Sequence, residues 1–474
     1  MNFTSLTNPY TLDERPLVLQ LSCSPFVQSD IIVWISANVS FIMLIYWVQS
    51  AFYAVLSLLW QLMIIVAVVL AIVFPVFFYY LGLKMNYVKD LSEVGYSYLD
   101  GRGSGYNKYG KTKKQLINDI RKARKIGNLP PVYPNGWFAL LESSELKPKQ
   151  AKYVSALGEN FAVFRSERGE VHVLDAYCPH LGANIAIGGF VRGDCIECPF
   201  HQWQFSGHDG RCVNIPYSGK VPEFARVKHW QSLEVNDFVF VWYHAEQEEP
   251  SWRPEPMDKI TSGDWWYRGR SEYLINSHIQ EIPENGGDIA HLNAIHAPSL
   301  VAGSDLHDLE NTAAKSARHV WEATWEPHTT AGETHIATMN LRHDLRIIDR
   351  VPLPLIGMNV EAKQIGPGYV EMVMHTCIGR LAILQTVTPV EPMLQKVIHR
   401  IYCPPHLFWY ANIVLYGECI MIERDIMVWN HKTYIDKPLL VKEDRTLARH
   451  RRWYSQFYTE HSPRFDFKKD TLDW

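Results

Sequence analysis

The longest apolar segment of the sequence lies near its amino terminus. No Lys, Arg, Asp or Glu occurs from Ile31 through Leu83, and a helix of that length would exceed the roughly 30 Å hydrocarbon core of a bilayer. The strongest span is 56–80, which only Ser57 and Gln61 interrupt. This pattern predicts a transmembrane helix over 56–80. The weaker span 31–49 is long enough to form the other arm of a helical hairpin, so the pattern is compatible with one or two crossings.

A basic stretch follows the apolar segment. Nine Lys and Arg residues occur between Gly101 and Lys125, against the single acid Asp119. By the positive-inside rule, this excess places the long carboxyl-terminal part in the cytosol. Within the stretch, Leu116, Ile117 and Ile120 recur at near-helical spacing. They predict an amphipathic helix that lies either on anionic headgroups or in solution as an ordinary charged helix.

The pattern becomes β-like after the turn-rich segment 130–136. Two short apolar runs, 161–164 and 171–174, flank a polar turn at 167–170 and predict a β-hairpin. Further strand-like runs precede a helix-like stretch at 417–429, which predicts an α+β unit with an antiparallel sheet. The predicted strands of this unit are 351–360, 369–377 and 381–390. The predicted division of the chain is a membrane anchor (1–84), a basic cytosolic linker (85–132), a β domain (133–245) and an α+β catalytic domain (246–474).

Composition narrows the possible functions. The chain has 474 residues, enough for about three structural units. Its formal net charge of −4 lacks the basic excess of a nucleic-acid binder, so no nucleic-acid partner is expected. Eight cysteines scattered over this length do not form a disulfide framework. The useful question is therefore whether any of them have the spacing of metal ligands.

Two cysteines have that spacing. Cys178-Pro-His180 is followed, after seventeen intervening residues, by Cys198-Pro-Phe-His201. Tetrahedral zinc is one possible occupant, but a zinc finger usually takes its two cysteines from one loop and its two histidines from another. Here each loop supplies one residue of each kind. That arrangement favours a Rieske [2Fe–2S] centre, in which two thiolates hold one iron and two imidazoles hold the other.

A second set of candidate ligands begins at Glu284. Asp288 is followed by His291 and His296. Mononuclear Fe(II) that activates O₂ is bound by two imidazoles and one carboxylate on one face. Five residues of an ideal helix turn through about 500°, so the two histidines can converge only if the helix bends or ends between them. Pro298, just beyond His296, is consistent with a helix end.

Both motif sets resemble those of the Rieske non-haem iron oxygenases. The resemblance extends through Trp203 and the Asp209-Gly210 turn, and the Asp-x-x-x-Trp pattern at Asp425 and Trp429 supplies a distant acid. It implies an all-β Rieske domain and a helix-grip-like catalytic domain. The implied ligands are Cys178, His180, Cys198 and His201 for the cluster, and His291, His296 and Asp425, rather than Glu423, for the mononuclear iron. Asp288 would link His291 to His201 of a neighbouring subunit, which implies a homotrimer.

Within that class, the anchor, the basic linker and the Asp425-Ile-Met-Val-Trp429 ending most closely resemble the cholesterol 7-desaturase (Neverland) family. The resemblance implies conversion of cholesterol to 7-dehydrocholesterol with O₂ and NAD(P)H-derived electrons, an early step of steroid hormone synthesis. It also implies residence in the endoplasmic reticulum membrane. No G-x-G-x-x-G fingerprint opens a helix here, so a separate reductase must supply the electrons. Two alternatives remain at this point: a steroid or other lipid hydroxylase of the same fold, and a membrane-anchored Rieske electron carrier.

Overall fold

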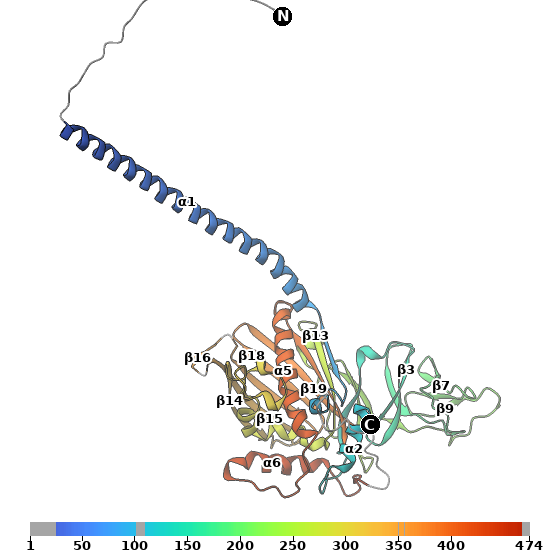
Figure 1. Ribbon diagram of the computed structural model, residues 1–474. Helices are drawn as coiled ribbons and strands as arrows, with labels where there is room; N and C mark the ends of the chain where they lie inside the picture. Colours follow the sequence, from blue (N-terminus) through green and yellow to red (C-terminus); the bar gives the residue numbers. More distant parts are fainter. Residues whose placement is uncertain (1–24, 101–109, 349, 355, 467–474) are drawn as a thin grey trace, which may run out of the picture. The chain divides into compact units, whose positions relative to one another are not determined.

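The structure is a computed structural model in which two compact units are distinguished, 1–78 and 79–474 (Figure 1). The described residues are 25–100, 110–348, 350–354 and 356–466. Arg102 and Lys108 of the predicted basic stretch lie outside these ranges.

The apolar segment forms one continuous helix, α1 (Pro25–Gly82). The part from Val33 to Gly82 has a mean hydropathy of 3.0 in its most apolar window, and its large apolar side chains are exposed. Such a surface suits a lipid environment. The second arm of a hairpin is not formed within the described residues, because no Gly or Pro lies between Gln49 and Leu56 to break the helix. Pro75 is accommodated near its carboxyl-terminal end.

The predicted β domain consists of three small antiparallel sheets. The hairpin predicted around residues 167–170 is confirmed, since β4 pairs with β5 from Phe161↔Asp175 to Arg165↔Val171. The first sheet has the order β10 (His229–Trp230), β5 (Val171–Asp175), β4 (Glu159–Arg165), β3 (Ala151–Ala156). The second is β11 (Ser232–Val235), β12 (Phe238–Tyr243), β2 (Gly136–Glu142). The third is β6 (Phe190–Arg192), β7 (Cys195–Glu197), β8 (Gln204–Ser206), β9 (Cys212–Asn214).

The catalytic domain is built on a nine-stranded sheet. All its pairings are antiparallel except that of β1 with β13. The strands run in the order β1 (Met85–Lys89), β13 (Trp266–Ile275), β20 (Leu394–Cys403), β19 (Gly379–Glu391), β18 (Tyr369–Thr376), β17 (Met358–Ile365), β15 (Ile336–Ile347), β14 (Ala317–Pro327), with β16 (Val351–Pro352) paired to β15. The predicted α+β class is confirmed.

The segment predicted as a linker contributes two elements to this fold. One is β1, the edge strand of the large sheet. The other is α2 (Lys113–Ala123), which begins with a capping box between Thr112 and Gln115. Its apolar face packs against the protein, because Ile117 is buried in a cluster with Leu91, Tyr96, Leu99 and Leu394. Lys114 and Lys122 of α2 remain exposed, so the structure agrees with the predicted alternative of an ordinary solvated helix face.

One long helix lies against the large sheet. This helix, α5 (Phe408–Trp429), packs on β13 and β20 (Figure 1). The shorter helices are α3 (Asp258–Thr261), α4 (Ile289–Ala294) and α6 (Arg445–Tyr454). The 3-10 turns are η1 (Ser97–Leu99), η3 (Ser143–Glu145), η4 (Ile279–Glu281), η5 (Pro283–Gly286), η6 (Leu300–Ala302), η7 (Leu306–Asp308), η8 (Pro405–Leu407), η9 (Lys442–Asp444) and η10 (Ser455–Phe457).

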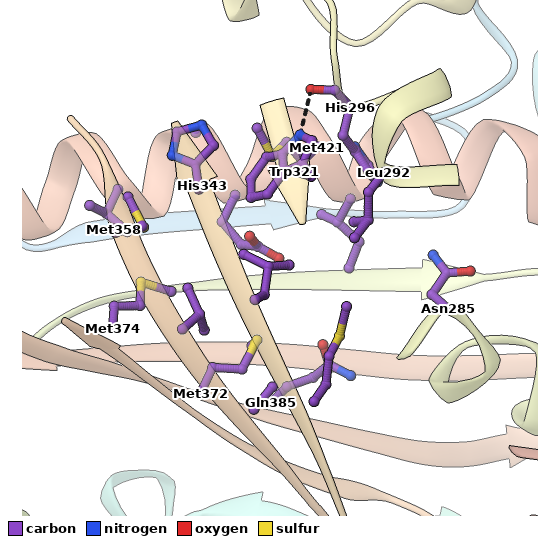
Figure 2. Close-up of a pocket in the computed structure, with 18 of the residues that line it drawn as sticks. Asn285, Leu292, His296, Trp321, His343, Met358, Met372, Met374, Gln385 and Met421 are labelled. Atoms are coloured by element: carbon purple, nitrogen blue, oxygen red, sulfur yellow. Dashed lines mark hydrogen bonds between the residues drawn. The ribbon is translucent and has the colours of Figure 1, made fainter. Parts of the chain in front are cut away.

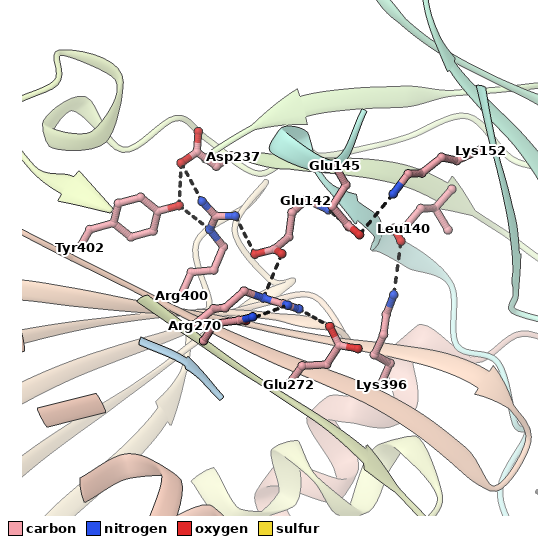
Figure 3. A network of polar contacts seen from close by, with 11 residues as sticks. Leu140, Glu142, Glu145, Lys152, Asp237, Arg270, Glu272, Lys396, Arg400 and Tyr402 are labelled. Carbon is pink, nitrogen blue, oxygen red and sulfur yellow. Dashed lines mark hydrogen bonds and ion pairs between the residues drawn. The ribbon is translucent and has the colours of Figure 1, made fainter. Parts of the chain in front are cut away.

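A buried ion-pair network joins the β domain to the large sheet (Figure 3). Glu142, at the end of β2, accepts from Arg400 Nη1 at 2.6 Å and lies 2.9 Å from Arg270 Nε. Arg400 also contacts Asp237 Oδ2 at 3.2 Å. The guanidinium groups come from neighbouring strands of the catalytic sheet, β13 and β20. Glu142 of the β domain therefore contacts two cations of the large sheet, and each of these cations also has a second acidic partner, Asp237 for Arg400 and Glu272 for Arg270.

Candidate metal centres and substrate cavity

The two predicted Rieske loops meet in space. Each lies between strands of the β domain, the first after β5 and the second after β7. Their backbones close into tight turns, in which Cys178 N donates to Ala183 O at 2.9 Å and Cys198 N donates to Trp203 O at 2.8 Å. The His180 and His201 rings have centroids 4.6 Å apart. The structure thus brings one cysteine and one histidine from each loop to a common place.

The chemistry of these side chains fits an iron–sulfur cluster. Both Cys178 and Cys198 are buried, and burial, together with the neighbouring Cys198, raises the pKa of the Cys178 thiol to about 11. Two adjacent thiolates would need a cation to be stable there. The buried Nδ1 of His180 has no hydrogen-bond partner within the described part of the chain. An unpaired lone pair at this position suits a metal ligand.

Around the cluster site, a tryptophan stacks on the His180 ring, and several apolar side chains are exposed. Trp203 stacks on His180 with ring centroids 4.8 Å apart and an interplanar angle of 7°, and its Nε1 donates to Tyr217 Oη at 2.8 Å. Leu181, Phe200 and Tyr217 are each at least 60% exposed. Exposed apolar side chains gathered around a redox site are typical of a protein-binding surface.

The second predicted ligand set also converges. His291, His296 and Asp425 each place a ligand atom within 4.8 Å of those of the other two. One of these approaches is 3.1 Å, between His296 Nε2 and Asp425 Oδ1. The expectation that the helix ends between the histidines is confirmed, because α4 stops at Ala294 and His296 lies beyond it. Glu423, by contrast, accepts from Ser304 Oγ at 2.8 Å and stays outside this group.

The donor set fits a two-histidine, one-carboxylate iron site. Burial lowers the pKa of His291, although Asp425 opposes the shift, so its imidazole is neutral and its lone pair is available. His291 Nδ1 contacts the backbone carbonyl of Asp288. That contact fixes the ring and leaves Nε2 free for a metal. Two imidazoles and one carboxylate occupy three positions of such a site, so a bound ion would keep further positions for O₂.

Asp288 caps the helix that carries His291. Its Oδ1 accepts a hydrogen bond from the backbone N–H of His291 at 3.4 Å, which makes it the N-cap of α4. The residue is half-buried, so part of its carboxylate remains accessible. Asp288 has no contact with His201 among the described residues of this single chain. The predicted link joins Asp288 to His201 of a second copy of the chain.

Arg424, which motif analysis passed over, holds the His296 segment in place. Its fully buried guanidinium donates to the carbonyls of Ile295, Pro298, Ser299 and Gly303 at 2.9–3.1 Å. Trp321 Nε1 donates to His296 O at 3.2 Å. The available signal was that Arg424 is the one basic residue of α5 and is adjacent to the predicted acid ligand.

A cavity of about 650 Å³ opens beside the triad. This volume lies in the usual range for pockets that enclose small organic ligands. The lining is mostly apolar and includes the methionines Met339, Met358, Met372, Met374 and Met421. Figure 2 shows the labelled side chains extending from His296 and Asn285 at one end to Met358 and Met374 at the other. A large, rigid, apolar molecule fits such a lining.

Most polar side chains of the cavity are paired with protein groups. His319 Nδ1 lies 2.8 Å from His343 Nε2, and burial lowers their pKa values to about 3 and about 4, so the pair is neutral. Gln385 Oε1 lies 2.8 Å from His399 Nε2. Glu418 of α5 is different: burial raises its pKa to about 7. Sequence motifs gave no indication of these groups, because they come from separate strands and helices.

The fold and the paired sites define a Rieske non-haem iron oxygenase. A family model described as the Rieske [2Fe-2S] domain matches residues 136–225, and one described as the 3-Ketosteroid 9alpha-hydroxylase C-terminal domain matches 241–458. A crystal structure of dicamba monooxygenase superposes with a TM-score of 0.53 at 14% identity, covering 69% of this chain and 98% of that one. That likeness concerns the fold alone. The protein is an oxidoreductase, and its two donor sets fit one [2Fe–2S] cluster and one mononuclear non-haem iron.

Two relatives define the family more closely. A cholesterol 7-desaturase of Xenopus laevis is 45% identical over 397 residues, covering 83% of this chain and 85% of the relative. A probable 3-ketosteroid-9-alpha-monooxygenase oxygenase component of Rhodococcus rhodochrous is 30% identical, covering 73% and 87%. The chain belongs to the cholesterol 7-desaturase family.

Proposed function

We propose that this protein converts cholesterol to 7-dehydrocholesterol, using O₂ and electrons that a separate reductase takes from NAD(P)H. The observation that carries the proposal is the apolar cavity with the triad of His291, His296 and Asp425 on its wall. The family relationship supports the same reaction. A sterol is rigid and almost wholly apolar, which matches a lining of methionines and aliphatic side chains.

The residues that would hold the metal groups follow from the donor sets. We assign Cys178, His180, Cys198 and His201 to the cluster, and His291, His296 and Asp425 to the mononuclear iron. When bound, the cluster supplies electrons one at a time and the mononuclear iron activates O₂. The chain itself orients the ligands through Arg424 and Asp288. The apolar cavity excludes water from the substrate and holds one face of it toward the triad.

Electron delivery in this proposal runs between copies of the chain. Asp288 would connect His291 to His201 of a second copy, in a homotrimer. Two features support this: the partial exposure of Asp288, and the apolar surface formed by Leu181, Phe200 and Tyr217 around the cluster site. The reductase would have to reach the same cluster. Asp288 would therefore act as a positioning residue for electron transfer.

The proposed location is the endoplasmic reticulum membrane, with the catalytic part in the cytosol. The apolar helix α1 supports a membrane anchor, and the basic residues that follow it support the cytosolic orientation. Cholesterol dissolves in bilayers, so an anchor would keep the enzyme close to its substrate.

The proposal is tested by mass analysis of sterols from cells that express the full chain together with a reductase. A sterol with a new 7,8-double bond is expected, and Asp425→Ala should abolish it while the visible absorption of the cluster persists. Purified wild-type protein should hold about three irons and two inorganic sulfides per chain, and the variant about two irons. If cells that express the wild-type protein together with the reductase contain no modified sterol, the proposal is refuted.

Hydroxylation is the second candidate reaction. The match of residues 241–458 to the 3-ketosteroid 9α-hydroxylase domain favours it. The same mass analysis separates the two reactions, because hydroxylation adds one oxygen to the sterol whereas desaturation removes two hydrogens.

A further inference from the structure

Glu418 is a carboxyl group in the apolar cavity without a protein partner. It lines the cavity from α5. The charges that influence it are those of His296 and Asp425, and no described residue forms a hydrogen bond with it. Outside the triad, two ionisable groups of the described lining have no hydrogen-bond partner, the carboxyl group of Glu418 and the hydroxyl of Tyr410, whereas His319 and His343 pair with each other. Glu418 is the one of the two that can carry a negative charge near neutral pH.

A carboxyl group in such a place is costly. Burying a polar group without a hydrogen bond destabilises the folded state, and burying a charge does so more strongly. Burial accordingly raises the pKa of Glu418 to about 7, with a further rise from Asp425. Native proteins pair nearly all their buried polar groups. The missing partner of Glu418 is therefore expected to come from what occupies the cavity.

The position of Glu418 relative to the triad fits one part of a sterol. Glu418 precedes Asp425 by two turns of α5, about 10.5 Å along the helix axis, and both side chains line the cavity. The C3 hydroxyl oxygen and carbon C7 of a sterol are separated by five bonds of ~1.5 Å, which bond angles near tetrahedral shorten to a through-space distance of roughly 6 Å. A hydroxyl within about 3 Å of Glu418 would bring C7 toward His291, His296 and Asp425.

We propose that Glu418 binds the 3-hydroxyl group of the sterol substrate and so sets both substrate choice and the carbon presented to the triad. This inference rests on the proposed sterol function and identifies its polar anchor. The ionised form of Glu418 accepts a hydrogen bond from a 3-hydroxyl group but gains none from a 3-keto group, which has no proton to donate; the protonated form can donate to either oxygen, so the selectivity belongs to the ionised form. Glu418 thereby favours 3-hydroxysterols over the 3-ketosteroids named for the Rhodococcus relative.

Direct binding of two radiolabelled sterols to the purified full-length holoenzyme tests the inference. One is cholesterol, and the other is cholest-5-ene, which lacks only the hydroxyl. Wild-type protein should bind cholesterol at least about 10-fold more tightly, the range expected for one hydrogen bond to a charged group. Glu418→Leu should reduce this preference to about 2-fold or less. Glu418→Gln, whose amide still accepts a hydrogen bond, should retain most of it.

Glu423→Gln is the matched control, since it also removes a buried acid from α5 but lies outside the cavity. It should leave the ratio of the two affinities unchanged. The inference is overturned if Glu418→Leu keeps the wild-type ratio or weakens both sterols equally. It is also overturned if Glu418→Gln and Glu418→Leu lower turnover alike without changing either affinity, which would indicate a proton donor.

Product analysis of the same protein variants, supplied with a reductase, NADPH and O₂, separates this inference from the proposed function. If the wild-type protein prefers cholesterol, Glu418→Leu loses this preference, and the wild-type protein forms no 7-dehydrocholesterol, then the proposed reaction is refuted and the binding role remains. Formation of 7-dehydrocholesterol by Glu418→Leu, with an unchanged affinity ratio, would refute the binding role alone. Iron and sulfide content of each variant shows whether it has folded with both metal sites intact.

Discussion

His296 Nε2 lies 3.1 Å from Asp425 Oδ1, although the two residues are far apart in the sequence and belong to different elements. The contact depends on the loop that follows α4, which Arg424 binds through four backbone carbonyls. Because Arg424 and Asp425 are adjacent on α5, one helix both contributes the acid and fixes the segment that carries the histidine.

Replacement of Arg424 by lysine should lower the occupancy of the mononuclear iron. A lysine has one ammonium in place of a planar group with five donors, so it cannot satisfy carbonyls in several directions. Buried carbonyls left unpaired would let the His296 segment move. We expect the iron content per chain to fall from about three toward two, with two sulfides retained. An unchanged iron content would contradict this positioning role.

Two substitutions of Asp288 separate its helix-capping role from its proposed electron-transfer role. Asn caps helices as well as Asp does, whereas Ala does not and costs about 1 kcal/mol. Asp288→Asn should therefore preserve stability and metal content. If the carboxylate links the two sites, both variants should slow oxidation of the reduced cluster in single-turnover experiments with sterol and O₂. If the reduced cluster is oxidised at the normal rate in Asp288→Asn and slowly only in Asp288→Ala, then Asp288 acts only as a helix cap.

The sequence predicted those parts of the sites whose ligands are close in the chain. The Cys178 and Cys198 loops each carry their own histidine, and the end of α4 between His291 and His296 followed from the geometry of their spacing. The resemblance to a family supplied Asp425. These features depend on local backbone geometry, which a short motif encodes.

Other features depend on tertiary packing and escaped prediction. Glu418 and the His319–His343 pair reach the cavity only once the large sheet and α5 have assembled. Helix α5 begins at Phe408, nine residues before the predicted start, because its first turns are apolar on nearly all sides and give no clear period. The parallel pairing of β1 with β13 joins segments that no sequence pattern connects.

Acidification should destabilise the folded protein between pH 6.5 and about 4. Burial lowers the pKa of His278 and His399 to about 4, and that of His450 to about 3. The unfolded chain binds protons near pH 6.5, whereas the folded chain does not until lower pH. The unfolded state therefore binds more protons in this window, and the free energy of unfolding falls by up to about 1.4 kcal/mol per pH unit for each histidine.

Urea unfolding at pH 7.0, 6.0 and 5.0 measures this dependence. His399→Gln, which can keep a hydrogen bond to Gln385, should reduce the slope by about one proton. Equal unfolding free energies at pH 7.0 and 5.0 in the wild-type protein would show that these histidines do not control acid stability.

Glu142 provides a test of how the two domains are held together. It compensates Arg270 and Arg400, and the side chains of Glu142 and Arg400 are each only 4% exposed. Glu142→Gln keeps the shape but removes the carboxylate that Arg400 and Arg270 share, which leaves Arg400 with Asp237 and Arg270 with Glu272 as acidic partners. Removing one partner of a buried ion pair typically costs about 3–5 kcal/mol, so the urea midpoint should fall markedly.

Glu145→Gln is the control for this substitution. Glu145 pairs with Lys152 at 3.5 Å, with both side chains more than a third exposed, and such pairs contribute about 1 kcal/mol or less. If the two substitutions lower the free energy of unfolding equally, the buried network is not what couples the domains. If only Glu142→Gln is strongly destabilised, the network couples the two domains. An iron and sulfide content equal to that of the wild-type protein, measured at urea concentrations below the unfolding transition, will then show that the network stabilises the interface without forming either metal site.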